Sequence, residues 1–208
     1  QKAVEINPKD AEAHSNLGVI LQELKRLEEA EASFRKAIEL KPDYVEAYSN
    51  LGIILNELNR FLDAEVSFRK AIELNPNFVK AYSNLGNILR EINNLDEAEI
   101  VYRQAIALEP NYTEAHYNLG NTLKELGRLD KAEASYRQVI ALNPDYAEAY
   151  NNLAVTLKEL DRLQEAEASY RQAIIINPDY AQAHSNLGAA LQELGRLEEA
   201  EASYRKAI

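Results

Sequence analysis

The chain is a tandem repeat with a period of 34 residues. All of its prolines obey this spacing, at positions 8, 42, 76, 110, 144 and 178. A fixed period of this length, with no insertion or deletion, is typical of proteins that stack one small supersecondary module many times. Each module is too small to bury its own apolar face, so neighbouring modules must share one elongated core. The period therefore constrains the fold more than any other feature.

Each repeat predicts two helices. In residues 113–146, apolar and small residues recur at three- and four-residue spacing from Thr113 to about residue 126, and again from about residue 129 to residue 142. Such spacing places one apolar stripe on one face of each helix. Gly127 separates the two helices, and Pro144 closes the repeat because proline cannot continue a helix. The predicted fold class is therefore an all-α solenoid of helix-turn-helix units.

The same spacing predicts how the chain is divided and where helices begin. Asp145 is expected to cap the helix that follows it. The side chain of Glu148, three residues later, is expected to accept a hydrogen bond from the backbone amide of Asp145. We expect residues 1–208 to form a single array without a cap at either end, an excerpt of a longer array whose exposed terminal faces associate end to end. Its predicted parts are the end of a truncated repeat at 1–10, full repeats at 11–44, 45–78, 79–112, 113–146 and 147–180, and an incomplete repeat at 181–208.

Composition excludes several classes of function. The chain carries 34 acidic and 23 basic residues, for a net charge of −11. This balance disfavours nucleic acid, which is bound by clustered lysine and arginine, and it disfavours an anionic membrane surface. No cysteine is present, so disulfides and thiolate metal sites are excluded. No apolar run is long enough to span a bilayer. The location is undetermined by these observations, and a soluble cytoplasmic array is the expectation.

Small and aromatic residues occupy fixed positions that predict close helix packing. The third position of every repeat is alanine, and the eighth is glycine except at Ala154. A small residue at the eighth position allows the paired helix to approach, although glycine costs up to about 1 kcal/mol in a helix interior. The twenty-fourth position of each repeat lies in the second helix and is a large aromatic residue: Phe34, Phe68, Tyr102, Tyr136, Tyr170 and Tyr204.

These residues resemble the tetratricopeptide repeat. In the fourth repeat, the pattern consists of His116, Leu119, Gly120, Ala132, Tyr136, Val139 and Pro144. The resemblance covers the whole chain and departs from the family pattern where histidine or tyrosine replaces the usual tryptophan, and at Ala154 and Val139. It implies a right-handed superhelix in which the first helices line a concave groove. Such arrays bind extended peptides or partner helices and are not themselves enzymes.

An asparagine stands at the sixth position of every repeat and is the main candidate for binding. Asparagine is a mediocre helix former, so six copies in mid-helix need a cause. One interpretation is a ladder of amides that pair with the backbone of a bound peptide, similar to the peptide-binding array of O-linked N-acetylglucosamine transferases. The other is that each amide bonds to the neighbouring repeat and fixes the stack. The six are Asn16, Asn50, Asn84, Asn118, Asn152 and Asn186.

Further residues, at the second, fifth, ninth, twelfth and thirteenth positions, are expected to line the same groove. The second, ninth, twelfth and thirteenth positions carry more glutamate than lysine and arginine, so the groove favours a neutral or basic segment over an acidic one. A basic patch within it offers a place for one local anionic group, although solvated charges with no fixed partner are an equal alternative. The candidates are Asn87 and Asn121, with Lys80, Arg90, Lys124 and Lys158 as the patch.

No residue pattern predicts a reactive centre. His14, His116 and His184 share the fourth position with tyrosines of other repeats, so they are interpreted as space-filling rather than as a base or a metal site. The fifth position lacks the lysine with which some tetratricopeptide domains grip a terminal carboxylate. Glutamate and arginine at the twenty-first and twenty-fifth positions form i,i+4 pairs with a structural role. No phosphate loop, nucleophile motif or metal motif occurs, so no catalytic residue, metal or cofactor is predicted.

Three functions remain open from the sequence. The leading one is a non-catalytic scaffold that holds an extended peptide or partner segment in the groove. The second is the substrate-targeting region of a larger enzyme such as a glycosyltransferase. The third is a structural spacer, which would make contacts mainly through its outer helices or its ends.

Overall fold

The computed structural model describes residues 10–208 of the chain. The predicted truncated repeat at 1–10 lies outside the described residues, except for Asp10. The described part contains twelve helices and no strand, two helices for each predicted repeat, so the all-α prediction is confirmed. The helices are α2 (Ala11–Glu23), α3 (Leu27–Leu40), α4 (Val45–Glu57), α5 (Phe61–Leu74), α6 (Val79–Glu91), α7 (Leu95–Leu108), α8 (Thr113–Glu125), α9 (Leu129–Leu142), α10 (Ala147–Glu159), α11 (Leu163–Ile176), α12 (Ala181–Glu193) and α13 (Leu197–Lys206). Helices α8 and α9 match the predicted ranges within one residue.

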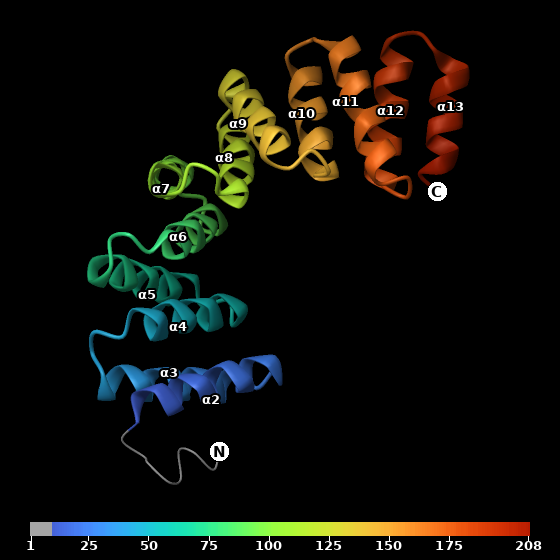
Figure 1. Cartoon of the computed structure of the whole chain (residues 1–208). Coiled ribbons are helices and arrows are strands. Elements are labelled where there is room, and N and C mark those ends of the chain that lie inside the picture. Colours follow the sequence, from blue (N-terminus) through green and yellow to red (C-terminus); the bar gives the residue numbers. More distant parts are fainter. Residues whose placement is uncertain (1–9) are drawn as a thin grey trace. The chain divides into compact units, whose positions relative to one another are not determined.

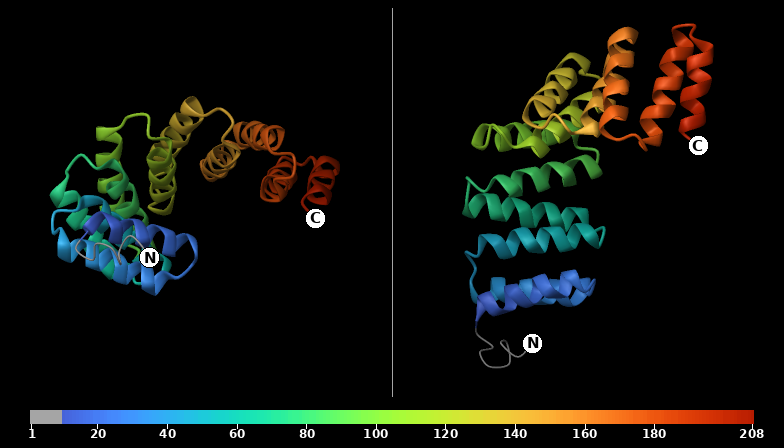
Figure 2. Two further views of the ribbon diagram at one scale, coloured as in Figure 1. Left: turned by 60° about the horizontal axis from the view of Figure 1, so that its bottom comes forward. Right: turned by 45° about the vertical axis from the view of Figure 1, so that its right-hand side comes forward.

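The helices form two compact units, the first ending at Glu109 and the second running from Pro110 to Ile208. Within each unit, every helix packs on the next helix of the chain, as the ribbon shows (Figures 1 and 2). The first helices of neighbouring repeats also contact one another, α2 with α4 and α4 with α6 in the first unit, and α8 with α10 and α10 with α12 in the second. Whether residues 1–208 form a single array stays a prediction.

The turn inside each repeat depends on one residue in the left-handed backbone region. This fifteenth residue is Gly127 in the fourth repeat, with φ of 70°, and Lys25 in the first, with φ of 60°. The amide of Lys25 donates to the carbonyl of Gln22, and the next amide, of Arg26, donates to that of Leu21. This pair of bonds is the Schellman motif, which satisfies the last carbonyls of a helix and reverses the chain.

The predicted helix cap at Asp145 is wrong. Helix α10 begins at Ala147, and its cap position is occupied by Tyr146, whose side chain makes no capping bond. Asp145 lies one residue too early to reach the free amides, and its own amide donates to Asn143 Oδ1 at 3.2 Å. Tyr146 instead packs its ring against Tyr117, with centroids 5.1 Å apart. The cap position is therefore occupied by a tyrosine that packs against a neighbouring ring, and not by a polar residue that caps the helix. Asp10 does cap α2, because it stands directly before the helix.

The core of five of the six described repeats is an aromatic ring packed against a glycine, and Ala154 replaces the glycine in the fifth. A Cβ added to Gly120 would lie 2.7 Å from Cε1 of Tyr136, and one added to Gly86 would lie 2.5 Å from Cε1 of Tyr102. Real Cβ atoms do not approach a ring so closely, so the glycine determines how near the two helices can lie. Tyr102 and Tyr136 are completely buried, as are the alanines at the twentieth position of the same helices, such as Ala132. The expectation that a small eighth residue allows close approach is confirmed.

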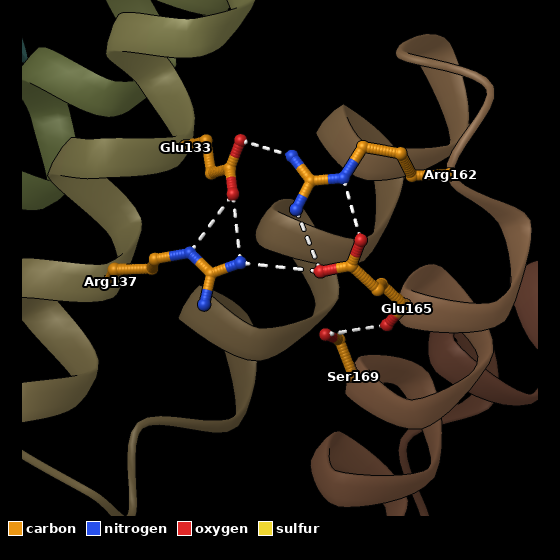
Figure 3. Close-up of polar contacts among 5 residues, drawn as sticks. All are labelled: Glu133, Arg137, Arg162, Glu165 and Ser169. Atoms are coloured by element: carbon orange, nitrogen blue, oxygen red, sulfur yellow. Dashed lines mark hydrogen bonds and ion pairs between the residues drawn. The ribbon is translucent and has the colours of Figure 1, made fainter.

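Ion pairs connect the second helices of neighbouring repeats. Glu133 on α9 binds Arg137 at 2.8 Å on its own helix and Arg162, which precedes α11, at 2.7 Å (Figure 3). Arg162 also binds Glu165 at 2.7 Å, and Arg137 reaches the same carboxylate at 3.6 Å. The same arrangement recurs around Glu31 and Glu167. The predicted i,i+4 pairs therefore exist, and they are part of a network that crosses from one repeat to the next.

This network shifts the pKa of its carboxylates. Burial raises the pKa of Glu133, but hydrogen bonds from Arg162 and Arg137 lower it by more, so that it lies below its ordinary value of 4.5. The hydrogen bond from Arg162 likewise lowers the pKa of Glu165. A carboxylate whose pKa is lowered by folding stabilises the folded state above its unfolded pKa, and this contribution is lost as the pH falls through its folded pKa.

Replacement of Tyr136 tests the ring-on-glycine contact. Tyr136→Ala should lower the free energy of unfolding by roughly 3–5 kcal/mol, because it leaves a cavity in a fully buried site. Tyr136→Phe keeps the ring and loses only the hydrogen bond of the hydroxyl, so it should cost about 0.5–1.5 kcal/mol. Urea unfolding followed by circular dichroism measures both. Equal losses for the two variants would contradict the primary role of the ring.

Acid stability tests the ion-pair network. Glu133→Gln should lower the melting temperature at about pH 7, and the difference from the original chain should shrink as the pH falls below 4.5 and through the lowered pKa of folded Glu133. The control is Glu198→Gln on α13, an exposed glutamate for which the described residues show no ion pair. A difference for Glu133→Gln that is as large at the low pH as at the high pH would show that the network does not stabilise the fold through charge.

Candidate functional site

The sixth-position asparagines lie on one face of the first helices, here called the asparagine face. It comprises the second, sixth, ninth, twelfth and thirteenth positions of each repeat. Asn16 and Lys80 are exposed. The other predicted site residues are half-buried: Asn50, Asn84, Asn87, Arg90, Asn118, Asn121, Lys124, Asn152, Lys158 and Asn186. Each asparagine stands in the middle of its helix, so its position is fixed by a rigid backbone.

In the fifth and sixth repeats, the sixth-position amides bond to the preceding repeat. Asn152 on α10 donates from Nδ2 to the hydroxyl of Tyr117 and to Oδ1 of Asn121, each at 3.0 Å. Asn186 on α12 donates to Oδ1 of Asn151 at 3.0 Å. The acceptors Tyr117 and Asn151 both occupy the fifth position of the preceding repeat. In these two repeats the asparagine therefore fixes the stack.

In the first unit, the same position is left without such bonds. Asn16, Asn50 and Asn84 make no side-chain hydrogen bond within residues 10–208. The fifth position of the preceding repeat is Ser15 for Asn50 and Ser49 for Asn84. Both serines are buried and too short to reach the next amide. The stacking interpretation therefore holds for Asn152 and Asn186. The peptide-contact interpretation stays a prediction for the others.

The ninth-position asparagines serve the core of their own repeats. Oδ1 of Asn87 accepts a hydrogen bond from the hydroxyl of Tyr102 at 2.6 Å, and Oδ1 of Asn121 accepts one from Tyr136 at 2.7 Å. Each bond satisfies the polar end of a buried ring. Their predicted contact with a peptide stays a prediction.

Charges at the twelfth and thirteenth positions pair across neighbouring repeats. Nζ of Lys158 lies 2.7 Å from Oε1 of Glu193. Nε2 of Gln22 donates to Oε1 of Glu57 at 2.6 Å, and Lys25 binds the same carboxylate. The predicted basic patch is therefore partly neutralised by the chain itself. Lys80 and Arg90 belong to the first unit, and Lys124 and Lys158 to the second.

The fourth-position residues hold the chain that enters the repeat. Nε2 of His116 lies 2.9 Å from the carbonyl oxygen of Pro110, and His184 makes the same contact with Pro178. The Tyr82 hydroxyl donates to the equivalent carbonyl of Pro76 at 3.2 Å. A carbonyl only accepts, so Nε2 carries the proton in both histidines. Tyrosine and histidine exchange here because each can donate one hydrogen bond to the closing proline.

The part of the chain that the structure describes brings together no group of three histidine, aspartate or glutamate side chains able to hold a metal. None of the helices between Asp10 and Ile208 has the length and apolar character needed to cross a bilayer.

The sequence placed the fifth position on the groove but did not predict that its residues accept hydrogen bonds from the next repeat. Tyr117 and Asn151 interrupt a series of serines, Ser15, Ser49, Ser83 and Ser185. The signal was present, since a long polar side chain one residue before each asparagine can reach the next repeat.

Family models match nearly the whole described chain. Those described as tetratricopeptide repeat match residues 11–44, 45–78, 67–100, 117–181 and 181–208, and one described as TPR repeat matches residues 86–127. Together the matched segments run from residue 11 to residue 208. The comparison with curated protein sequences gave no match.

Solved structures show the same fold. The crystal structure of YrrB, titled a TPR protein with an unusual peptide-binding site, is 29% identical and covers 88% of this chain and 94% of its own, with a TM-score of 0.74. MamA is 25% identical over 76% of this chain and 92% of its own, with a TM-score of 0.72. PilW, a type IV pilus biogenesis factor, is 22% identical, covers 93% of this chain and 90% of its own, and shows the fold alone, with a TM-score of 0.81. These structures confirm the predicted helical solenoid.

Alanine substitution separates the two kinds of asparagine by stability. Asn152→Ala removes hydrogen bonds to Tyr117 and Asn121, so it should lower the free energy of unfolding by about 1–3 kcal/mol. Asn84→Ala removes no such bond and introduces a better helix former, so its effect should be neutral or stabilising, within about 0.5 kcal/mol. Urea unfolding of both variants measures the difference. Equal destabilisation would show that Asn84 also supports the stack.

Proposed function

Because the chain belongs to the tetratricopeptide repeat family, we propose that it is a non-catalytic scaffold whose asparagine face binds an extended segment of another protein. The observation that carries this proposal is the unpartnered state of Asn50 and Asn84. Both are half-buried and stand at equivalent places in successive repeats. Asparagine is a poor helix former, so a mid-helix asparagine that makes no hydrogen bond within the described chain destabilises its helix without stabilising the fold in another way.

The chemistry of a carboxamide suits a peptide backbone. Each amide offers a donor and an acceptor, so it can pair with the carbonyl and the amide of an extended chain whatever its side chains are. Placing the amides on packed helices lowers the entropy lost on binding, because the side chains are already confined. One amide in each repeat matches an elongated ligand better than a compact one.

The charge of the chain indicates the kind of segment. The net charge is −11, and each of the six first helices ends with a glutamate, from Glu23 to Glu193. A neutral or basic segment is therefore favoured over an acidic one, mainly through faster association and rejection of like charge. YrrB, which is described as a TPR protein with an unusual peptide-binding site, supports a peptide ligand for such a fold.

The test is binding by a variant that keeps the fold. Random dodecapeptides displayed on phage are selected on the original chain, and the affinity of the selected peptides is then measured by fluorescence anisotropy. The double variant Asn50→Ala with Asn84→Ala should bind them about tenfold or more weakly, since two backbone-directed hydrogen bonds are lost. Circular dichroism should be unchanged.

The matched control is Gln104→Ala on α7, which removes an exposed carboxamide from a second helix, away from the asparagine face. It should leave the affinity unchanged. Undiminished binding by the Asn50 and Asn84 variant, or an equal loss for Gln104→Ala, would reject the asparagine face as the binding surface.

A further inference from the structure

A cavity opens on the asparagine face between the fifth and sixth repeats. Its volume is about 330 Å³, and it lies among helices α10, α11 and α12 of the second unit. The ninth-position residues of both repeats line it, together with the twelfth and thirteenth positions of the fifth repeat. The lining residues are Val155, Lys158, Glu159, Tyr170, Asn186 and Ala189.

The hydroxyl of Tyr170 has no partner at this cavity. Its side chain is only 1% exposed, yet it makes no hydrogen bond within residues 10–208. The equivalent Tyr102 and Tyr136 donate to the ninth-position asparagines of their own repeats. In the fifth repeat the ninth residue is Val155, which cannot accept a hydrogen bond. The fifth repeat therefore keeps the tyrosine but lacks the asparagine that would accept its hydrogen bond. Val155 and Tyr170 both line the cavity.

The Tyr170 phenol is neutral at physiological pH. Burial raises its pKa well above the ordinary value, and the carboxylates of Glu159 and Glu193 raise it further. A neutral phenol has an oxygen that can accept a hydrogen bond from a ligand.

The charge left over at the cavity is negative. Lys158 is already paired with Glu193 at 2.7 Å. Glu159 makes no ion pair within the described residues and is exposed. It is also the last residue of α10, where the partial negative charge of the helix end favours a cation. An acidic ligand group would therefore meet an uncompensated carboxylate, and a basic one would neutralise it.

We propose that this cavity is a specificity pocket for one lysine or arginine side chain of the bound segment. The methylene stem packs on Val155 and Ala189, and the N–H groups donate to the Tyr170 hydroxyl oxygen and the Glu159 carboxylate. The inference rests on the proposed function, since it places one side chain of a segment whose backbone is held elsewhere by amides. It adds a sequence preference that backbone pairing alone does not provide.

The test uses short capped alanine peptides with arginine, norleucine or glutamate at the centre, titrated against isotope-labelled protein and followed by NMR. The arginine peptide should bind about fivefold or more tightly than the norleucine peptide, and the glutamate peptide should bind most weakly. Shifts should concentrate on the residues that line the cavity. Failure of the original chain to prefer arginine overturns the inference.

Three variants test the pocket by separate routes. Tyr170→Phe should weaken arginine-peptide binding about fivefold, and Glu159→Gln, an exposed change, should remove the preference for arginine over norleucine. Val155→Asn restores the acceptor found in the third and fourth repeats. Its side chain should hydrogen-bond to the Tyr170 hydroxyl, and it should weaken arginine-peptide binding about as much as Tyr170→Phe does. Tyr136→Phe is the control and should have no effect, because its hydroxyl is already bound by Asn121. Unchanged binding by both Tyr170→Phe and Glu159→Gln overturns the inference.

The outcomes separate the pocket from the groove. Phage-selected peptides that depend on Asn50 and Asn84 but show no basic preference, and do not respond to Tyr170→Phe, would refute the pocket and leave the proposed function standing. An arginine preference that depends on Tyr170, in peptides indifferent to Asn50 and Asn84, would support the pocket and refute the backbone ladder.

Discussion

The contact between an aromatic ring and a glycine backbone fixes the geometry of five of the six described repeats. A Cβ added to Gly86 would lie 2.5 Å from the ring of Tyr102, so the two helices approach to a distance that glycine allows without a shift of the ring. Because the same pair recurs, the two helices pack in the same way in each of these repeats, and the sixth-position asparagine has the same place on its first helix.

Burying a tyrosine in that position creates a polar group that must be satisfied. The third and fourth repeats meet the need with Asn87 and Asn121, and the first and second repeats avoid it by using phenylalanine beside Val19 and Ile53. The fifth repeat does neither, and its phenol lies at a cavity. When one repeat lacks a hydrogen bond that equivalent repeats make, the unsatisfied group is a candidate for binding a ligand.

Charged residues are divided between the two sets of helices. Arginine and glutamate on the second helices form networks such as that of Glu133, Arg137 and Arg162, which connect successive repeats. The first helices keep an excess of glutamate on the asparagine face, only part of which is paired. Stacking depends on both sets of helices, because Asn152 and Asn186 on the asparagine face also bond to the preceding repeat.

The 34-residue period alone determined the all-α class, the paired helices, their limits and the residues of the core, because each of these depends on local spacing and on residue size. The helix cap at Asp145 was mispredicted, since the tertiary contact of Tyr146 with Tyr117 outweighs a local capping preference. The sequence also identified the six asparagines but left two roles open for them. Only the tertiary structure decided that Asn152 and Asn186 bond across the stack while Asn50 and Asn84 do not. The difference depends on whether a side chain of the preceding repeat reaches the amide of the asparagine. The repeat pattern does not give the distance between these two groups, because they lie on different repeats.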